Sequence, residues 1–164
     1  MAKKTIKVAL TVESIDRAIH EIEQRRKEIE SKVDQIIDAM LVAGENYAIA
    51  TVGHVDTGAT MSSIHGYRNG NKGVIVAGGA AIWIEFGTGV IRNKQPHPKA
   101  NELGMAKWGT YGKGHGTDPN GWWYYDENGE KHHTRGIESN RFMYQTAEYL
   151  KQHFPQYAIE VFSK

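Results

Sequence analysis

The sequence predicts an α+β protein, because an alternating apolar stretch, a long helical repeat and two hairpin signals follow one another along the chain. Its 164 residues suit one domain of ordinary size. We therefore expect residues 1–164 to form a single domain, with a long N-terminal helix, a C-terminal helix and antiparallel strands.

The first expected element is a strand over residues 5–12. Ile6, Val8 and Leu10 alternate with polar or small residues, which gives the strand one apolar face. This alternation is typical of a half-buried strand.

A long helix is expected next. Apolar residues recur at spacings of four and three from Ile15 to Met40, and Arg26 is the one polar interruption. The repeat predicts a helix of about 28 residues and about 42 Å, with Gly44 as a candidate cap or kink and residues 46–52 as a candidate for a further turn or two. The helix is longer than a protein of this size needs to cover a small sheet. Two interpretations stay open: part of the apolar stripe faces another subunit, or all of it packs on the chain's own sheet.

Short strands are expected in the middle of the chain. Residues 61–67 and 73–77 flank Asn69-Gly70, a dipeptide that favours a hairpin turn. The apolar run 80–86, which ends at Gly87-Thr88-Gly89, predicts a further strand that enters a loop or a short helix.

The second half contains a long loop, a hairpin and a helix. Residues 92–121 have no apolar periodicity, and a loop of this length is usually functional or mobile. Aromatic residues 122–125 and residues 130–134 flank a four-residue turn, which predicts an aromatic hairpin over 122–134. A helix is expected over 140–151, with Pro155 breaking or kinking it.

Composition excludes several classes of function. The net charge is +1, with 20 basic and 19 acidic side chains, so the chain has no large field with which to hold a polyanion. The absence of cysteine excludes disulfides, thiolate metal sites and thiol catalysis. Neither a signal peptide nor a membrane span is expected, and synthesis in the cytoplasm is the default.

Asp56-Thr57-Gly58 matches the catalytic loop of aspartic proteases, of which a homodimer would supply two copies. Such a loop needs an apolar strand before it, and the residues that precede Asp56 are too interrupted by polar groups and glycine. We favour a structural interpretation, in which Asp56 caps a turn and Gly58 supplies a permissive backbone.

Eight histidines suggest a metal site, but none of them forms a motif typical of zinc enzymes. Glu85, inside an apolar run, could act as an acid; we favour a carboxylate that pairs with a basic group or binds loop amides. No cofactor or metal is expected.

Aromatic side chains are concentrated at Trp122-Trp123-Tyr124-Tyr125, with Trp108 and Tyr111 before them. Alternation along a strand would bury one face in the core and leave the other exposed. Tryptophan and tyrosine are favoured anchors of protein interfaces, although stacking on carbohydrates or bases would use the same residues. An interface is the favoured interpretation.

The order of the motifs is more informative than any one of them. After the strand and the long charged helix come Asp56-Thr57-Gly58 with Ser62-Ser63-Ile64, Trp83-Ile84-Glu85-Phe86-Gly87-Thr88-Gly89, His97-Pro98, Gly121-Trp122-Trp123-Tyr124-Tyr125-Asp126, Thr134-Arg135-Gly136 and Arg141-Phe142-Met143-Tyr144. In this order the chain resembles the putative tail-component family of lambdoid-like tailed phages, also called the neck or tail-completion family. The resemblance spans nearly the whole chain and departs at 137–140, where the family more often has a proline.

The resemblance implies a structural virion protein of the head–tail junction, not an enzyme, with its long helix packed on an antiparallel sheet. It would be made in the host cytoplasm and assemble as a ring or collar of identical copies. Its neighbours would be portal-proximal head-closure proteins and tail-terminator or tail-tube proteins, with at most indirect contact with DNA. The motif and interface candidates are Asp56, Thr57, Gly58, Glu85, Gly87, Thr88, Gly89, Trp108, Trp122, Trp123 and Phe142.

Two other classes stay open. One is a small hydrolase, either a zinc-dependent cell-wall enzyme or a dimeric aspartic protease, using Asp56, His97, His115 or His132. The other is a regulatory or DNA-contacting protein, against which the near-zero net charge argues.

Overall fold

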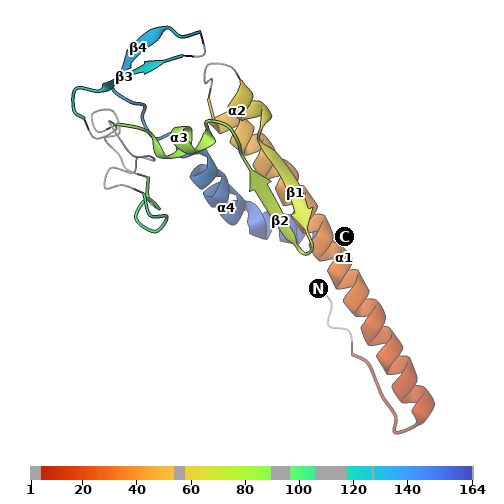
Figure 1. The fold of residues 1–164 in the computed structure, drawn as a ribbon. Helices are drawn as coiled ribbons and strands as arrows, with labels where there is room; N and C mark the ends of the chain where they lie inside the picture. The colour runs from red at the N-terminus through yellow and green to blue at the C-terminus, as the bar shows by residue number, and fades with distance from the viewer. Residues whose placement is uncertain (1–4, 54–57, 90–96, 106–117, 127, 164) are drawn as a thin grey trace.

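The computed structural model describes residues 5–53, 58–89, 97–105, 118–126 and 128–163. Its elements are α1 (Val12–Thr51), α2 (Ala59–Ser62), β1 (His65–Asn69), β2 (Lys72–Val76), α3 (Ala81–Phe86), β3 (Trp122–Tyr125), β4 (Lys131–Thr134) and α4 (Phe142–Phe162). This is the expected α+β fold (Figure 1). Within the described residues, however, the strands form two separate antiparallel pairs, β1–β2 and β3–β4, rather than one sheet.

Helix α1 confirms the predicted long helix and extends it at both ends. The Thr11 side chain accepts a hydrogen bond from the Ser14 amide at 3.3 Å, which caps the N-terminus. Gly44 lies inside the helix, where a methyl group would overlap Ile75 Cδ1 and lie 2.8 Å from Leu150 Cδ1. The glycine therefore allows β2 and α4 to approach α1 closely.

The predicted strand over 5–12 is wrong. Residues 5–9 have no regular structure, and α1 already begins at Val12. Val8 and Leu10 are exposed. A strand requires a partner for its backbone groups, and no described strand pairs with this segment.

The Asn69-Gly70 turn is confirmed. β1 and β2 are antiparallel with Asn69 opposite Lys72, and Gly70 has a φ of 61°. The hairpin lies along α1: the Gly66 amide donates to Glu45 Oε2 at 2.8 Å, and Arg68 pairs with Asp34 and Asp38 of α1. The predicted strand 61–67 is wrong over its first half, where α2 ends at Ser62.

The apolar run 80–86 forms a helix, α3, rather than the predicted strand. Two of its buried residues, Ile84 and Glu85, follow the buried Ala81 by three and four positions, which places them on the same face of a helix, and Phe86 is buried at the end of α3. A short apolar run fits a buried strand and a buried helix equally well, so the pattern alone does not separate them.

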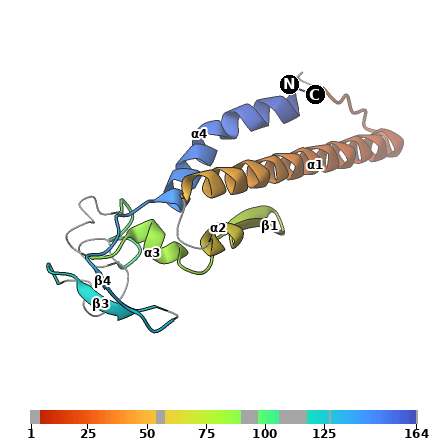
Figure 2. The same ribbon diagram turned by 90° about the horizontal axis from the view of Figure 1, so that it is seen from above.

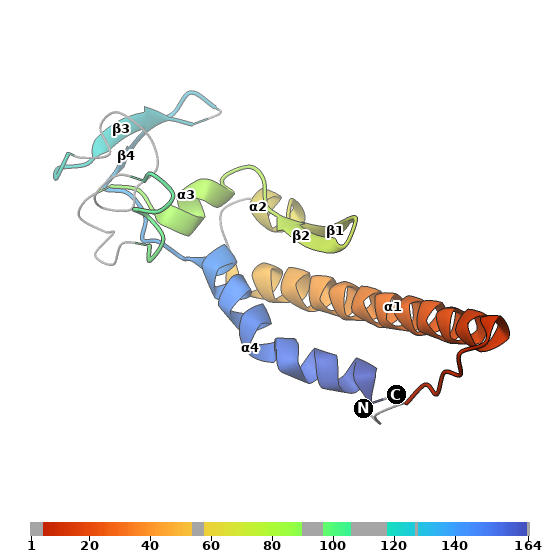
Figure 3. The same ribbon diagram turned by 90° about the horizontal axis from the view of Figure 1, so that it is seen from below.

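Helix α4 runs antiparallel to α1 (Figures 1 and 2). Tyr149 stacks on Tyr47 near the start of α4, with ring centroids 4.3 Å apart, and Lys32 Nζ lies 5.5 Å from the Phe162 ring at its end. The first 20 residues of α1 therefore extend beyond α4. The helix continues through Pro155 to Phe162, and Figure 3 shows that α4 changes direction along its length, which agrees with the expected kink rather than with a break.

The core lies where α1, α3 and the start of α4 meet. It contains Ala48, Val52, Ile64, Ala81, Ile84 and Phe142. Phe142 is 0% exposed, so this interface candidate is a core residue in the described structure. None of the described helices is long and apolar enough to cross a bilayer.

The predicted aromatic hairpin is confirmed as β3–β4, with Trp122 opposite Thr134 and Tyr125 opposite Lys131. It lies at the end of the molecule opposite the start of α1 (Figures 1 and 2). The fold thus has a helical centre, with a helical projection at one end and an aromatic hairpin at the other.

Candidate functional site

Glu85 joins α3 to the start of α4. Its Oε2 accepts a hydrogen bond from the Met143 amide at 2.8 Å, and its Oε1 accepts one from the Tyr144 amide at 2.9 Å. Amides in the first turn of a helix have no partner within the helix, and the helix dipole favours a negative charge there. The carboxylate therefore caps α4 from a distant part of the chain.

The backbone carbonyl of Glu85 makes the same connection. It accepts hydrogen bonds from the Ser139 hydroxyl at 2.6 Å and from the Arg141 amide at 3.2 Å. Arg141, the N-cap residue, has a φ of 61°, in the left-handed region. Glu85 thus holds the entry into α4 through both its side chain and its backbone.

His97 supports the carboxylate. Its Nδ1 accepts a hydrogen bond from the Lys99 amide at 3.0 Å, which leaves Nε2–H to donate to Glu85 Oε1 at 2.8 Å. The ring is 4% exposed and packs against Phe86 and Tyr144. Both ring nitrogens are thus occupied, and neither offers a lone pair to a metal ion.

Glu85 and His97 both contribute to the lining of a cavity of about 360 Å³. Apolar side chains line most of it, among them Ala77, Ile82 and Leu103. The carboxylate oxygens of Glu85 bind His97 and the amides of α4. This arrangement agrees with the structural interpretation of Glu85, which binds a histidine and helix amides, rather than with a free acid facing a substrate.

Two backbone segments cross next to Glu85. Thr88 and Ile137 exchange two hydrogen bonds, of 2.9 and 3.0 Å. A methyl group on Gly136 would overlap the Thr88 carbonyl oxygen, and one on Gly89 would lie 2.6 Å from the Arg135 carbonyl oxygen. Both glycines have a positive φ, so the crossing requires glycine for space and for conformation.

The base of the hairpin is equally tight. A methyl group on Gly121 would overlap the Thr134 carbonyl oxygen, and Gly121 has a φ of 85°. The Gly87-Thr88-Gly89 and Thr134-Arg135-Gly136 motifs therefore interlock. They fix the aromatic hairpin to α3 and, through Glu85, to α4; we call this unit the Glu85 junction (residues 85–89, 97, 134–137 and 139–144).

The aromatic hairpin is open to solvent on both faces, which corrects the expectation that one face lies in the core. Trp123 is 59% exposed and lies beside His133, with Lys131 Nζ 4.8 Å from its ring centroid. Tyr124, also exposed, stacks on His132 on the other face. Trp122 is half-buried. Exposed aromatic rings held on a rigid hairpin form a surface suited to a protein partner.

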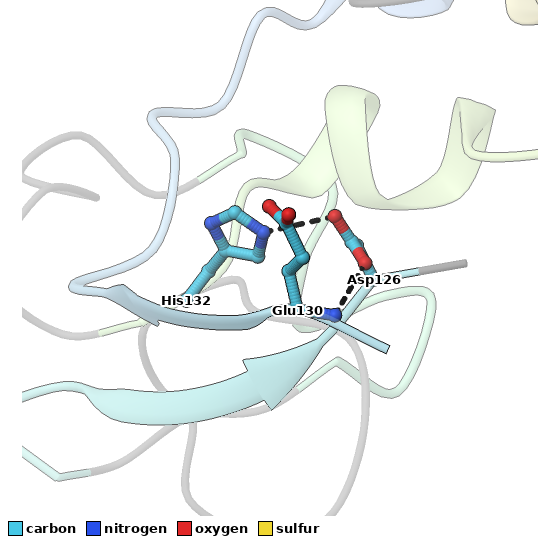
Figure 4. A group of neighbouring side chains, drawn as sticks. All are labelled: Asp126, Glu130 and His132. Carbon is cyan, nitrogen blue, oxygen red and sulfur yellow. Dashed lines mark hydrogen bonds and ion pairs between the residues drawn. The ribbon is translucent and has the colours of Figure 1, made fainter. Parts of the chain in front are cut away.

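The turn of the hairpin brings Asp126, Glu130 and His132 together (Figure 4). Asp126 Oδ1 accepts hydrogen bonds from the amides of Asn128 and Glu130, both at 2.9 Å, and Oδ2 lies 2.9 Å from His132 Nε2. The Glu130 amide, and then the His132 ring, lower the pKa of Asp126 below its usual value. Both carboxylate oxygens of Asp126 are thus used to close the turn.

The remaining candidates divide into two groups. Asp56, Thr57, Trp108 and His115 lie outside the described residues, as does most of the predicted 92–121 loop. Gly58 begins α2 with a φ of 68°, and Gly87 ends α3 with a φ of 71°. Both therefore occupy positions where a left-handed backbone favours glycine.

A scan of protein-family models, a search of curated proteins and a search of solved structures each found no match to this chain.

Proposed function

We propose that this protein is a structural subunit of a phage virion that assembles as a ring or collar at the head–tail junction, in a neck or tail-completion role. One observation carries the proposal: the motifs on which the resemblance rests are used in the Glu85 junction to hold elements of the fold together. Glu85 and His97 line a cavity, but both carboxylate oxygens and both ring nitrogens already have partners within the protein, whereas a catalytic pair would keep an atom for its substrate.

The surfaces left exposed support the same role. The aromatic hairpin presents Trp123 and Tyr125 at one end, and α1 presents a row of exposed isoleucines at the other. Exposed apolar surface of this extent marks interaction sites in soluble proteins. We assign the hairpin to a neighbouring ring, either the portal-proximal head-closure protein or the tail-terminator or tail-tube protein, and α1 to sister copies.

The role is non-enzymatic, and the protein contacts DNA at most indirectly. The near-zero net charge supports the second statement, because 20 basic and 19 acidic side chains give no large field that would attract a polyanion. The protein would be made in the host cytoplasm and end in the virion.

Deletion of the gene from the phage genome, with complementation in trans, tests this function. Heads and tails should both form but fail to join, and complementation with the wild-type chain should restore joined particles. Complementation with a Glu85→Gln chain separates a structural role of the carboxylate from a chemical one. If the role is structural, the fraction of joined particles should fall only as far as the folded fraction of the variant, measured alongside, falls. Joined, infectious particles in the deletion strain would overturn the proposal.

A further inference from the structure

The projecting part of α1 carries a seven-residue repeat of exposed apolar side chains. Val12, Ile15, Ile19, Ile22, Ile29 and Val33 are all exposed, with Ile22 58% exposed. Their spacing places Val12, Ile19, Arg26 and Val33 at the a positions of a heptad, and Ile15, Ile22 and Ile29 at the d positions. The b, c and f positions, which lie away from the row, are polar throughout from Glu13 to Asp34.

In the described chain the side chains of this row stay exposed, although Ala18, which flanks Ile15 and Ile22 at a g position, is buried. At its end, Phe162 of α4 contacts α1 at Lys32, and α4 does not extend further along α1. The next apolar residue of the repeat, Ile36, is buried within the protein. The exposed row is about 33 Å long at 1.5 Å per residue. An apolar stripe at strict heptad spacing is the pattern by which helices pair with helices.

The charges beside the row indicate what the partner is. The e positions are all acidic, Asp16, Glu23 and Glu30, and the g positions include two basic residues, Arg25 and Lys32. In a parallel pair, a g residue faces the e residue five positions further along the partner, which places Arg25 opposite Glu30 of a second copy. In an antiparallel pair, e faces e and g faces g, so acidic residues would meet acidic residues and basic would meet basic.

We infer that residues 12–33 of α1 form a parallel, in-register coiled coil with the same residues of further copies of this chain. This deepens the proposed function by naming the contact between sister copies. Copies related by rotation about one axis can present their helices in parallel, whereas an antiparallel contact is a closed two-fold pair. Isoleucine at every d position favours assemblies of more than two helices.

Arg26 sets the strength of the contact. At an a position of a parallel assembly it meets Arg26 of each other copy, beside the charge of Arg25. Within one copy, Arg25 pairs with Glu28 at 2.8 Å and Arg26 with Glu30 at 3.3 Å; all four side chains are exposed, and such pairs rearrange at little cost. Arg26 therefore fixes the register and keeps the free protein weakly associated until a ring brings the copies together.

The test measures the association of the purified full-length chain by analytical ultracentrifugation over a wide concentration range. Arg26→Ile should tighten self-association roughly tenfold or more, and adding Ile22→Asp to that variant should abolish the gain. Gln24→Asp, on the opposite face of α1, is the matched control and should change nothing. Circular dichroism at low concentration checks that every variant is folded.

Disulfides between introduced cysteines report whether the paired helices are parallel or antiparallel. The chain has no cysteine of its own, so no other disulfide can form. Ile15→Cys and Val33→Cys lie about 27 Å apart along the helix, so parallel copies can join 15 to 15 and 33 to 33 but not 15 to 33. Mass spectrometry of a mixture of the two variants in the Arg26→Ile background, with Gln24→Cys as the control for random collision, gives the answer. Association of Arg26→Ile no tighter than wild type, or a 15-to-33 disulfide, would overturn the inference. Both measurements use the purified protein alone. A negative result would therefore overturn the coiled coil without overturning the proposed function, and a deletion that leaves particles joined would overturn the proposed function without changing these two measurements.

Discussion

Glu85 Oε2 lies 2.8 Å from the backbone amide of Met143, although the two residues are 58 positions apart in the sequence. This bond connects the short helix α3 to the first turn of α4. It makes the Glu85 side chain a capping group, and it places the motifs around Glu85 and Phe142 in one structural unit.

Replacement of Glu85 by Gln should lower the free energy of unfolding by about 2–3 kcal/mol, since an amide group turned toward the Met143 or Tyr144 amides leaves a buried donor unsatisfied. Urea denaturation followed by circular dichroism measures the change. Glu138→Gln, at an exposed position, is the control and should stay within about 0.5 kcal/mol of wild type. An equally stable Glu85→Gln variant would show that the carboxylate does not cap α4.

Replacement of Gly136 by Ala should destabilise the protein far more than the same change at Gly104. Both glycines have a positive φ, but a methyl group on Gly136 overlaps the Thr88 carbonyl oxygen and one on Gly104 has open space. Gly104→Ala should cost about 1 kcal/mol from backbone strain alone, and Gly136→Ala about 3 kcal/mol or more. Thermal unfolding compares the two variants, and similar costs would contradict the tight crossing at Thr88.

Replacement of Trp123 by Ala should impair assembly without impairing folding. The side chain is largely exposed, so the free energy of unfolding should change by only about 0.5 kcal/mol. Complementation of the deletion strain, scored by the fraction of joined particles, should fall sharply for Trp123→Ala and be retained by Trp123→Phe. Loss of folded, soluble monomer would instead show that Trp123 stabilises the fold.

Acid should loosen the hairpin turn through Asp126. Because the folded state lowers the pKa of this carboxyl, the stability it contributes is present above the ordinary value near 3.8 and is lost as the pH falls through the lower, folded value. The indole resonances of Trp122 and Trp123, followed by NMR from neutral pH downward, should shift in that acidic range. In Asp126→Ala the turn should be loosened at every pH, and an unchanged acid transition in this variant would exclude Asp126 as its origin.

The sequence predicted the parts of the fold that have strong local signals. The four-and-three repeat identified α1, and the Asn69-Gly70 turn and the aromatic run identified both hairpins. The sequence left the end of α1 open, with a cap or kink at Gly44 or a further turn or two over 46–52, because the buried residues there are Gly44 and Ala48, whose small side chains give almost no apolar periodicity. Gly44 lies where Ile75 of β2 and Leu150 of α4 approach α1 closely.

The errors arose where local patterns depend on a distant partner. An alternating stretch such as 5–12 becomes a strand only beside a free sheet edge, and the apolar run 80–86 fits a helix or a strand until its neighbours are known. The structural role of Glu85 was anticipated, but its partners were not. His97 and the first turn of α4 are brought to it by loops whose paths carry no sequence signal.

The most direct test of the central claim is cryo-electron microscopy of purified particles combined with mass spectrometry of their proteins. The protein should be present in multiple copies, and a ring at the head–tail junction should contain density for helix α1 and for the hairpin β3–β4, with the hairpins against an adjoining ring. Particles that are joined and infectious but lack the protein would contradict the claim.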